Sequence, residues 1–192
     1  ENKVTGKVYD EKAGIGYVKI PGFKNGTAKE MKSEIESLKK KGCKKIIIDL
    51  RENTGGVMTE GVDCADQLLP KSKIMIVKDS KGKKKAYNSD SNNLGVECVL
   101  AVDGETASAS EIFAYALKDN GAAKLVGENT YGKGVIQGIY ELGDGSKLKL
   151  TISEYFSPKG NKINGIGIAP DIKADAKGDS ILEKCANVLR HK

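Results

Sequence analysis

Short apolar runs alternate with amphipathic segments along this chain, and turns rich in glycine or small residues separate them. The run at residues 45–50 (KIIIDL) is continuously apolar, which is typical of a strand buried on both faces of a central sheet. Similar strand patterns occur at 15–20, 73–77, 99–102 and 124–126, and helical periodicity occurs at 27–41, 57–69, 111–120 and 180–189. We expect Thr27 to cap the first of these helices.

Two alternating runs, at 135–142 and 147–155, flank the turn Gly143-Asp144-Gly145 and predict a β-hairpin. The polar lysine-rich stretch at 80–85 predicts a second, solvated hairpin tip. This order of elements predicts an α/β layered fold. Because 192 residues hold no repeat or low-complexity linker, we expect one domain over 1–192.

The histidine content excludes several kinds of catalytic site. His191 is the only histidine and stands next to the last residue, where chains usually fray. A Ser-His-Asp or Cys-His site and a histidine-rich metal site are therefore not expected. Any hydrolytic chemistry in this chain must use another base.

Cysteine and charge give further exclusions. Cys43, Cys64 and Cys98 stand in apolar contexts typical of buried side chains, and no C-x-x-C pair points to zinc, while the pairing of the four cysteines is left open. Net charge is +6, but Arg51 and Arg190 are the only arginines and aromatic residues make up 5%. That composition favours a solvated lysine surface over nucleic-acid binding. No apolar run approaches the roughly 20 residues that span a bilayer.

The turn Thr106-Ala107-Ser108-Ala109-Ser110-Glu111 precedes a predicted helix. The spacing Ser108-x-x-Glu111 fits a capping box. A serine here also has its oxygen in the field of the helix N-terminus, where the Ala109 N–H is available as an oxyanion donor. The two interpretations are compatible.

Two other turns have chemistry-bearing patterns. Residues 127–134 (GENTYGKG) match the G-x-x-x-x-G-K frame of a phosphate-binding loop, but Gly134 replaces the magnesium-binding Ser or Thr and a strand follows, which disfavours nucleotide binding. The glycines beside Lys133 predict close approach of backbone and substrate. The stretch 49–57 has two interpretations. Gly55 and Gly56 allow N–H groups to point at an anion, or the segment is an ordinary turn with Asn53 as a cap.

Taken together, these stretches resemble the carboxy-terminal processing peptidases, or tail-specific proteases, which are serine peptidases with a Ser-Lys dyad. The matching pieces span most of the chain: 14–20 (GIGYVKI), 46–56 (IIIDLRENTGG), 102–121 (VDGETASASEIFAYALKDNG), 125–137 (LVGENTYGKGVIQ) and 148–172 (LKLTISEYFSPKGNKINGIGIAPDI). The resemblance implies a crotonase-like fold of stacked ββα units and a serine endopeptidase that forms an acyl-enzyme near substrate C-termini.

By motif, the resemblance makes Ser108 the nucleophile rather than Ser110 or Thr106, Lys133 the general base and Gln137 the residue that orients it. It implies that the N–H groups of Ala109 and of the Gly55-Gly56 turn form the oxyanion hole. It implies neither metal nor other cofactor. Since Lys133 and Gln137 would be ~13 Å apart in a regular strand, their direct contact requires a bend or bulge near Gly134.

Relatives usually carry a PDZ domain that captures the substrate's C-terminus, and an export signal or membrane anchor. We find no PDZ-like stretch in these residues and expect that domain in a longer parent protein. The resemblance implies protein or peptide substrates with exposed C-termini and an extracytoplasmic location. The alternatives are a non-catalytic module that binds peptides or hydrophobic ligands on the same fold, and an acyl-CoA enzyme of crotonase type.

Overall fold

Six strands form the main sheet of the computed structural model, which describes residues 3–90 and 92–191. The strand order is β1-β2-β3-β6-β7-β10. β1 is antiparallel to β2, and the other neighbours are parallel. The strands are β1 (Thr5–Asp10), β2 (Ile15–Lys19), β3 (Lys45–Asp49), β6 (Glu97–Val102), β7 (Ala123–Gly127) and β10 (Ile172–Lys173).

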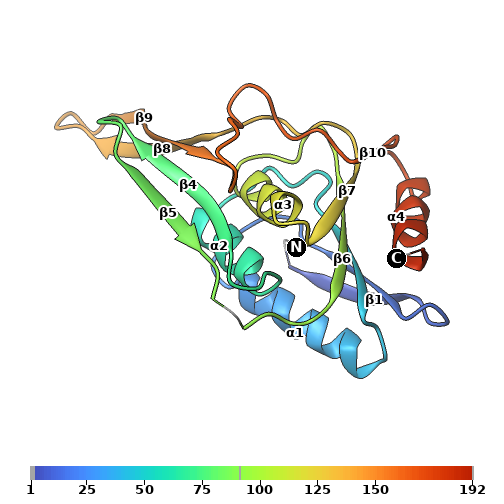
Figure 1. Cartoon of the computed structure of the whole chain (residues 1–192). Helices are drawn as coiled ribbons and strands as arrows, with labels where there is room; N and C mark the ends of the chain where they lie inside the picture. The colour runs from blue at the N-terminus through green and yellow to red at the C-terminus, as the bar shows by residue number, and fades with distance from the viewer. Residues whose placement is uncertain (1–2, 91, 192) are drawn as a thin grey trace.

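Helices cover both faces of this sheet (Figure 1). α1 (Thr27–Lys40), α2 (Met58–Asp66) and α3 (Ala109–Asp119) lie on one face, and α4 (Ser180–Arg190) lies on the other. β3 shows why its sequence is continuously apolar: Ile46 and Ile48 pack in the core under α1–α3, and Ile47 packs under α4. A strand buried on both sides cannot alternate with polar residues.

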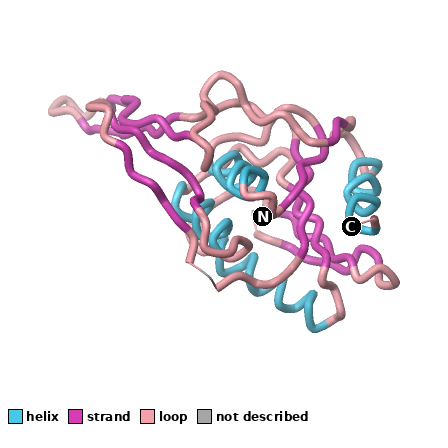
Figure 2. Tube along the Cα trace, viewed as in Figure 1, coloured by secondary structure: helices cyan, strands magenta, loops and turns pink. Residues whose placement is uncertain are grey.

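A second sheet of four antiparallel strands has the order β5-β4-β9-β8. Its strands are β4 (Lys73–Asp79), β5 (Lys84–Asn88), β8 (Val135–Glu141) and β9 (Lys147–Phe156). The two hairpins of this sheet project away from the helices and the main sheet, as the strand colouring in Figure 2 shows. α3 packs against β4 as well as β7, so it joins the two sheets.

The α/β fold predicted from the sequence is confirmed, and each predicted helix and strand has a counterpart within a few residues. β1 and β10 were not predicted, because β1 has no fully buried side chain and β10 has two residues, whereas β5 is the second arm of the hairpin whose tip was predicted at 80–85. The expectation that Thr27 caps α1 is wrong: Gly26 precedes the helix in a left-handed conformation, and Thr27 is the first helical residue.

The cysteines pack as the sequence predicts. Cys43, Cys64 and Cys98 belong to the core between the main sheet and α1–α3, and Cys185, on α4, packs in the core on the other face. Over residues 3–90 and 92–191, we find no helix with the length and hydropathy needed to cross a membrane.

Candidate active site

The three turns singled out in the sequence meet at one edge of the main sheet. β3, β6 and β7 are adjacent and parallel, so the turns that follow them leave from the same edge. The Ala107 N–H donates to the Asn53 carbonyl at 3.0 Å, which joins the first two turns. The Tyr131 N–H donates to the Thr106 carbonyl at 3.0 Å, which joins the second turn to the third.

Ser108, Lys133 and Gln137 line a single pocket of about 330 Å³. Gly56 and Tyr155 also border it, and the remaining lining residues are Met58, Ile112, Val135, Ile136, Ile139 and Lys149. Among the described residues that line this pocket there is no carboxylate. The pocket therefore combines two hydroxyls, two amines and one amide with five apolar side chains.

Ser108 has an uncommon backbone conformation. It stands directly before α3 with φ 58° and ψ −117°, a positive φ that residues with a side chain rarely adopt. Such a conformation costs on the order of 1–3 kcal/mol and persists only where the surroundings impose it. The capping box predicted with Glu111 supplies part of that constraint, because the Ser108 N–H donates to Glu111 Oε2 at 3.0 Å.

The Glu111 carboxylate is fully buried and accepts three more hydrogen bonds. Its Oε1 accepts from Thr130 Oγ1 at 2.5 Å and from the Gly132 N–H at 2.8 Å. Its Oε2 accepts from the Lys133 N–H at 2.8 Å. One carboxylate thus binds the backbone of both Ser108 and Lys133, which are 25 positions apart in the sequence.

Burial separates Ser108 from the neighbouring hydroxyls. Ser110 and Thr106 are both fully buried, and their hydroxyls donate to the backbone carbonyls of Asn53 and Leu50 at 3.0 Å each. Ser108 is partly exposed and borders the pocket. Of the three candidates, only Ser108 can meet a ligand in this pocket.

Tyr155 links the serine to the lysine loop. Its hydroxyl donates to the Lys133 carbonyl oxygen and interacts with the Ser108 side chain. Burial raises the pKa of Tyr155, the Glu111 carboxylate raises it further, and the contact with Ser108 offsets part of the rise. The phenol therefore stays protonated and available as a donor.

The predicted oxyanion donors lie close together, with one difference from the expectation. A Cβ at Gly55 would lie 2.6 Å from the Ala107 carbonyl oxygen and 2.9 Å from the Ala109 nitrogen. The Gly55 N–H, however, donates to Asn53 Oδ1 at 2.9 Å and so is not free to bind an oxyanion. Within the described residues no hydrogen bond uses the N–H of Gly56 or of Ala109.

Lys133 and Gln137 border the same pocket, and the glycines beside Lys133 pack closely within the fold. A Cβ at Gly132 would lie 2.8 Å from the Gly167 nitrogen, and one at Gly134 would overlap the Asn164 backbone. These glycines allow close packing against the segment 164–167 of the same chain. The loop is followed by β8 rather than a helix, as expected for a loop that binds no nucleotide.

A bulge lies close to Gly134, as the sequence required, but its extra residue belongs to the partner strand. The β8–β9 register shifts between Ile136 and Gln137, and the extra residue is Ile152 on β9. In the part of the chain that the structure describes, no hydrogen bond joins Lys133 to Ser108 or to Gln137. Catalytic hydrogen bonds often tighten only when substrate binds, so the relevant observation is that Ser108, Lys133 and Gln137 line one pocket.

The beginning of the 49–57 stretch serves another purpose. Arg51 Nη2 and Nε donate to the two carboxylate oxygens of Asp49 at 2.7 and 2.9 Å, and Arg51 Nη1 donates to the carbonyls of Ala176 and Gly178. Burial opposes the ionisation of Asp49, but Arg51 and the charge of Lys19 outweigh it and lower the pKa of Asp49. This ion pair fixes the segment that leads into α4.

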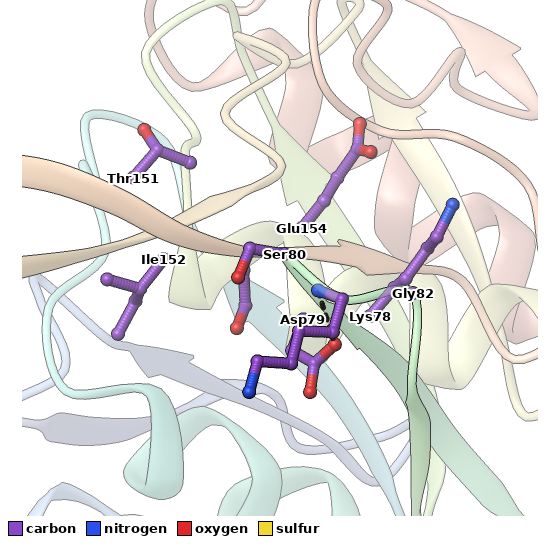
Figure 3. Close-up of a pocket in the computed structure, with 9 residues that line it drawn as sticks. Lys78, Asp79, Ser80, Gly82, Thr151, Ile152 and Glu154 are labelled. Carbon is purple, nitrogen blue, oxygen red and sulfur yellow. Dashed lines mark hydrogen bonds between the residues drawn. The ribbon is translucent and has the colours of Figure 1, made fainter.

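A separate hollow lies where the β4–β5 turn meets β9 (Figure 3). Lys78, Asp79 and Glu154 are among its lining residues, and Ser108 and Lys133 are not. Figure 3 also shows Thr151 and Ile152 pointing to opposite sides of β9.

Two functional contacts escaped the sequence analysis. Glu111 was interpreted only as a capping residue, and its distance of about twenty positions from Thr130, Gly132 and Lys133 hides its other partners. Tyr155 looked like a strand residue with an apolar ring. Its sole signal in the sequence is an aromatic hydroxyl on the buried side of a strand, where a hydroxyl needs a partner.

Comparisons with known proteins assign most of the chain to one family. Residues 14–174 match the sequence model of peptidase family S41. The chain is 36% identical over 163 residues to the chloroplastic C-terminal processing peptidase of Tetradesmus obliquus, covering 84% of this chain and 35% of that protein. It is 40% identical over 172 residues to a probable CtpA-like serine protease of Staphylococcus aureus, covering 87% and 34%.

The chain thus spans about a third of the length of these curated relatives. Among solved structures, the photosystem II D1 C-terminal processing protease superposes with a TM-score of 0.84 and 33% identity, covering 98% of this chain and 53% of that one. The similarity therefore extends over both sheets.

Proposed function

The chain belongs to peptidase family S41, as its sequence predicted, and on that premise we propose that it is the catalytic core of a serine endopeptidase with a Ser108–Lys133 dyad. One observation carries the proposal. Ser108, Lys133 and Gln137 border one pocket, while the competing hydroxyls of Ser110 and Thr106 are buried and bonded to carbonyls. A binding module would have no need of this set.

In the proposed acylation step, Ser108 Oγ attacks the scissile carbonyl carbon while neutral Lys133 accepts the Oγ proton. The N–H groups of Gly56 and Ala109 stabilise the oxyanion that forms, because neither is used within the described fold. The C–N bond then breaks as the Lys133 ammonium gives its proton to the departing amine. The product is an ester between Ser108 and the N-terminal part of the substrate.

In deacylation, Lys133 takes a proton from water, the hydroxide oxygen bonds to the ester carbon, and Ser108 Oγ leaves and recovers a proton from Lys133. This cycle requires the amine in its neutral form. Among the described residues that line the pocket there is no carboxylate to pair with the amine. Gln137 can orient the amine through its amide without adding negative charge.

We further propose that the substrates are proteins with exposed C-termini, and that a PDZ domain in a longer parent protein captures them. The names of the relatives support cleavage near a C-terminus. The chloroplastic name of one relative supports an extracytoplasmic or lumenal location.

The test is covalent labelling. A fluorophosphonate probe should modify Ser108 in the wild-type chain, located by peptide mapping, and Ser108→Ala should lose both labelling and peptide cleavage. Ser110→Ala, two positions away, is the matched control and should keep both. Peptide binding without any labelled serine would support the non-catalytic module instead.

The base is tested by pH and by substitution. Lys133→Arg should be inactive, because a guanidinium does not deprotonate. The wild-type kcat/KM should rise between pH 6 and pH 9 as the neutral amine becomes more abundant. An active arginine variant would exclude Lys133 as the base.

A further inference from the structure

A second lysine borders the pocket that holds Ser108. Lys149 lies on β9 and lines this pocket together with Lys133, the proposed base. The described residues in the pocket walls include neither Asp nor Glu, so the walls themselves do not balance the charge of an ammonium group. The proposed mechanism uses Lys133 and gives Lys149 no role.

The ladder between β8 and β9 shows which side chains surround Lys149. Residues that stand opposite each other in an antiparallel pair share one face of the sheet, and diagonal neighbours also lie within reach of a long side chain. Ile139 stands opposite Lys149, which makes Gln137 and Glu141 its diagonal neighbours on β8. Glu141 is the only acidic residue of β8, so it is the carboxylate on that strand that could pair with Lys149.

Glu141 is already paired with another lysine. Lys147 stands directly opposite Glu141, and Lys147 Nζ lies 3.4 Å from Glu141 Oε1. Farther along β9, Glu154 pairs with Lys162, also at 3.4 Å. In the part of the chain that the structure describes, the Lys149 side chain has no ion pair and no hydrogen bond. Unpaired lysines are ordinary on a surface, but this one borders the pocket of the nucleophile.

The two amines of the pocket differ in what the proposed reaction asks of them. Lys133 must be neutral to accept the Ser108 proton, so it cannot at the same time hold an anion as an ammonium. Lys149 takes no part in the proton transfer, and its side chain is exposed to solvent. An ammonium on a flexible stem at the pocket rim suits the recognition of a carboxylate on a bound molecule.

We propose that Lys149 selects substrates that carry a carboxylate close to the scissile bond. The carboxylate pairs with the Lys149 ammonium while the carbonyl carbon to be attacked meets Ser108. It belongs either to an Asp or Glu side chain or to the α-carboxylate of a substrate that ends shortly after the scissile bond. The inference rests on the proposed peptidase function and adds a specificity-determining residue to it.

Matched peptides that differ by one carboxylate test the proposal. One series places Glu, or its neutral isostere Gln, at each position on both sides of the cleaved bond. We expect the wild-type chain to prefer Glu over Gln at one position by about three- to fivefold in kcat/KM, mainly through KM, and to lose this preference in high salt. In Lys149→Met, which keeps an apolar stem without the charge, the Glu/Gln ratio should fall to about one.

Two further variants and a control make the test specific. Lys149→Arg keeps the positive charge and should retain the preference for Glu. Lys149→Glu should reverse it, so that a peptide with Lys at that position is cleaved faster than the Gln peptide. Lys147→Met is the matched control, because it removes a lysine from the same strand, two positions away and outside the pocket lining. It should keep the wild-type Glu/Gln ratio.

Amidation of the peptide C-terminus distinguishes the two sources of the carboxylate. If Lys149 binds a side chain, the Glu/Gln ratio should be the same in amidated and free-acid peptides. If it binds the α-carboxylate, amidation of a peptide cleaved near its end should lower kcat/KM of the wild-type chain about three- to fivefold and leave Lys149→Met unaffected.

Several results would overturn the proposal. The first is a wild-type chain that distinguishes neither Glu from Gln nor a free acid from an amide. The second is an equal loss of kcat/KM for Glu and Gln peptides in Lys149→Met, since Lys149 would then act on the catalytic groups and not on the substrate. The third is loss of the preference in Lys147→Met, which would assign it to the general positive charge of the hairpin.

Peptide binding separates this inference from the proposed function. Fluorescence anisotropy with Ser108→Ala measures the affinity for the same Glu, Gln, free-acid and amidated peptides without cleavage. A wild-type chain that the fluorophosphonate probe does not label would remove the peptidase function, whereas the binding ratios would still decide whether Lys149 recognises a carboxylate. A labelled Ser108 with equal affinities for all peptides would leave the peptidase function standing and exclude the role of Lys149.

Discussion

Replacing Glu111 by glutamine should be costly although it changes a single atom. The carboxylate accepts from three backbone N–H groups, of Ser108, Gly132 and Lys133, and from the Thr130 hydroxyl. An amide has one accepting oxygen. Whichever way it is turned, its NH₂ faces at least one buried N–H that has lost its acceptor.

The magnitude follows from these four bonds. A buried donor left unsatisfied costs about 1–3 kcal/mol. The bonds that remain lose their charge assistance, which roughly doubles the strength of such bonds. We therefore expect Glu111→Gln to lower the free energy of unfolding by about 2–5 kcal/mol, which a domain of ordinary stability survives.

Urea unfolding measures the stability change, and peptide cleavage measures activity under conditions where the variant is folded. Because Glu111 binds the backbone of both Ser108 and Lys133, kcat should fall even in the folded protein. Glu60→Gln is the control: Glu60 also accepts two backbone N–H groups, of Gly26 and Ala28 at 2.8 Å each, but it lies outside the pocket. An unfolding free energy within about 0.5 kcal/mol of wild type, the range of ordinary surface changes, would refute this reasoning.

Three further predictions concern neighbouring contacts. Tyr155→Phe should lower kcat/KM about tenfold with little unfolding, since it removes the donor to the Lys133 carbonyl; an unchanged rate would exclude the role. Gly134→Ala should cost about 1–3 kcal/mol in thermal unfolding because its methyl group meets the Asn164 backbone, whereas Gly143→Ala, in open space, should not. Asp49→Asn should cost about 3–5 kcal/mol at pH 7 by breaking the buried pair with Arg51. Because the pKa of Asp49 is lowered in the folded state, that stabilisation is complete above about pH 4 and disappears as pH falls further, so the two unfolding curves should converge in acid.

Local pattern was sufficient for most of the fold. The continuous apolar run of β3 and the periodicity of the helices come from burial, which a sequence records directly. β1 is exposed on much of its surface and pairs through its backbone, so its side chains carry little record of it. Gly26 replaced Thr27 as the residue before α1 because the chain turns there with a positive φ, which suits glycine.

In the candidate site, too, some features were predicted from the sequence and others were not. Ser108, Lys133 and Gln137 were predicted through family motifs, and the structure brings all three to one pocket. A motif does not show whether an N–H group is free to bind a ligand. Gly55 was expected as an oxyanion donor, and only the structure shows that its N–H donates to Asn53 Oδ1. The contacts of Glu111 and Tyr155 with Lys133 cross more than twenty positions, beyond the reach of any local pattern.

Ser108 follows β6 of the main sheet, whereas Lys133 stands between β7 of the main sheet and β8 of the projecting sheet. The position of the base relative to the nucleophile therefore depends on how the projecting sheet docks as well as on the main sheet. A chain in which the projecting sheet has not docked would hold the serine without a fixed base and could not cleave its neighbours. During denaturation, too, the projecting sheet can open before the main sheet melts, so cleavage should be lost ahead of the helical circular-dichroism signal.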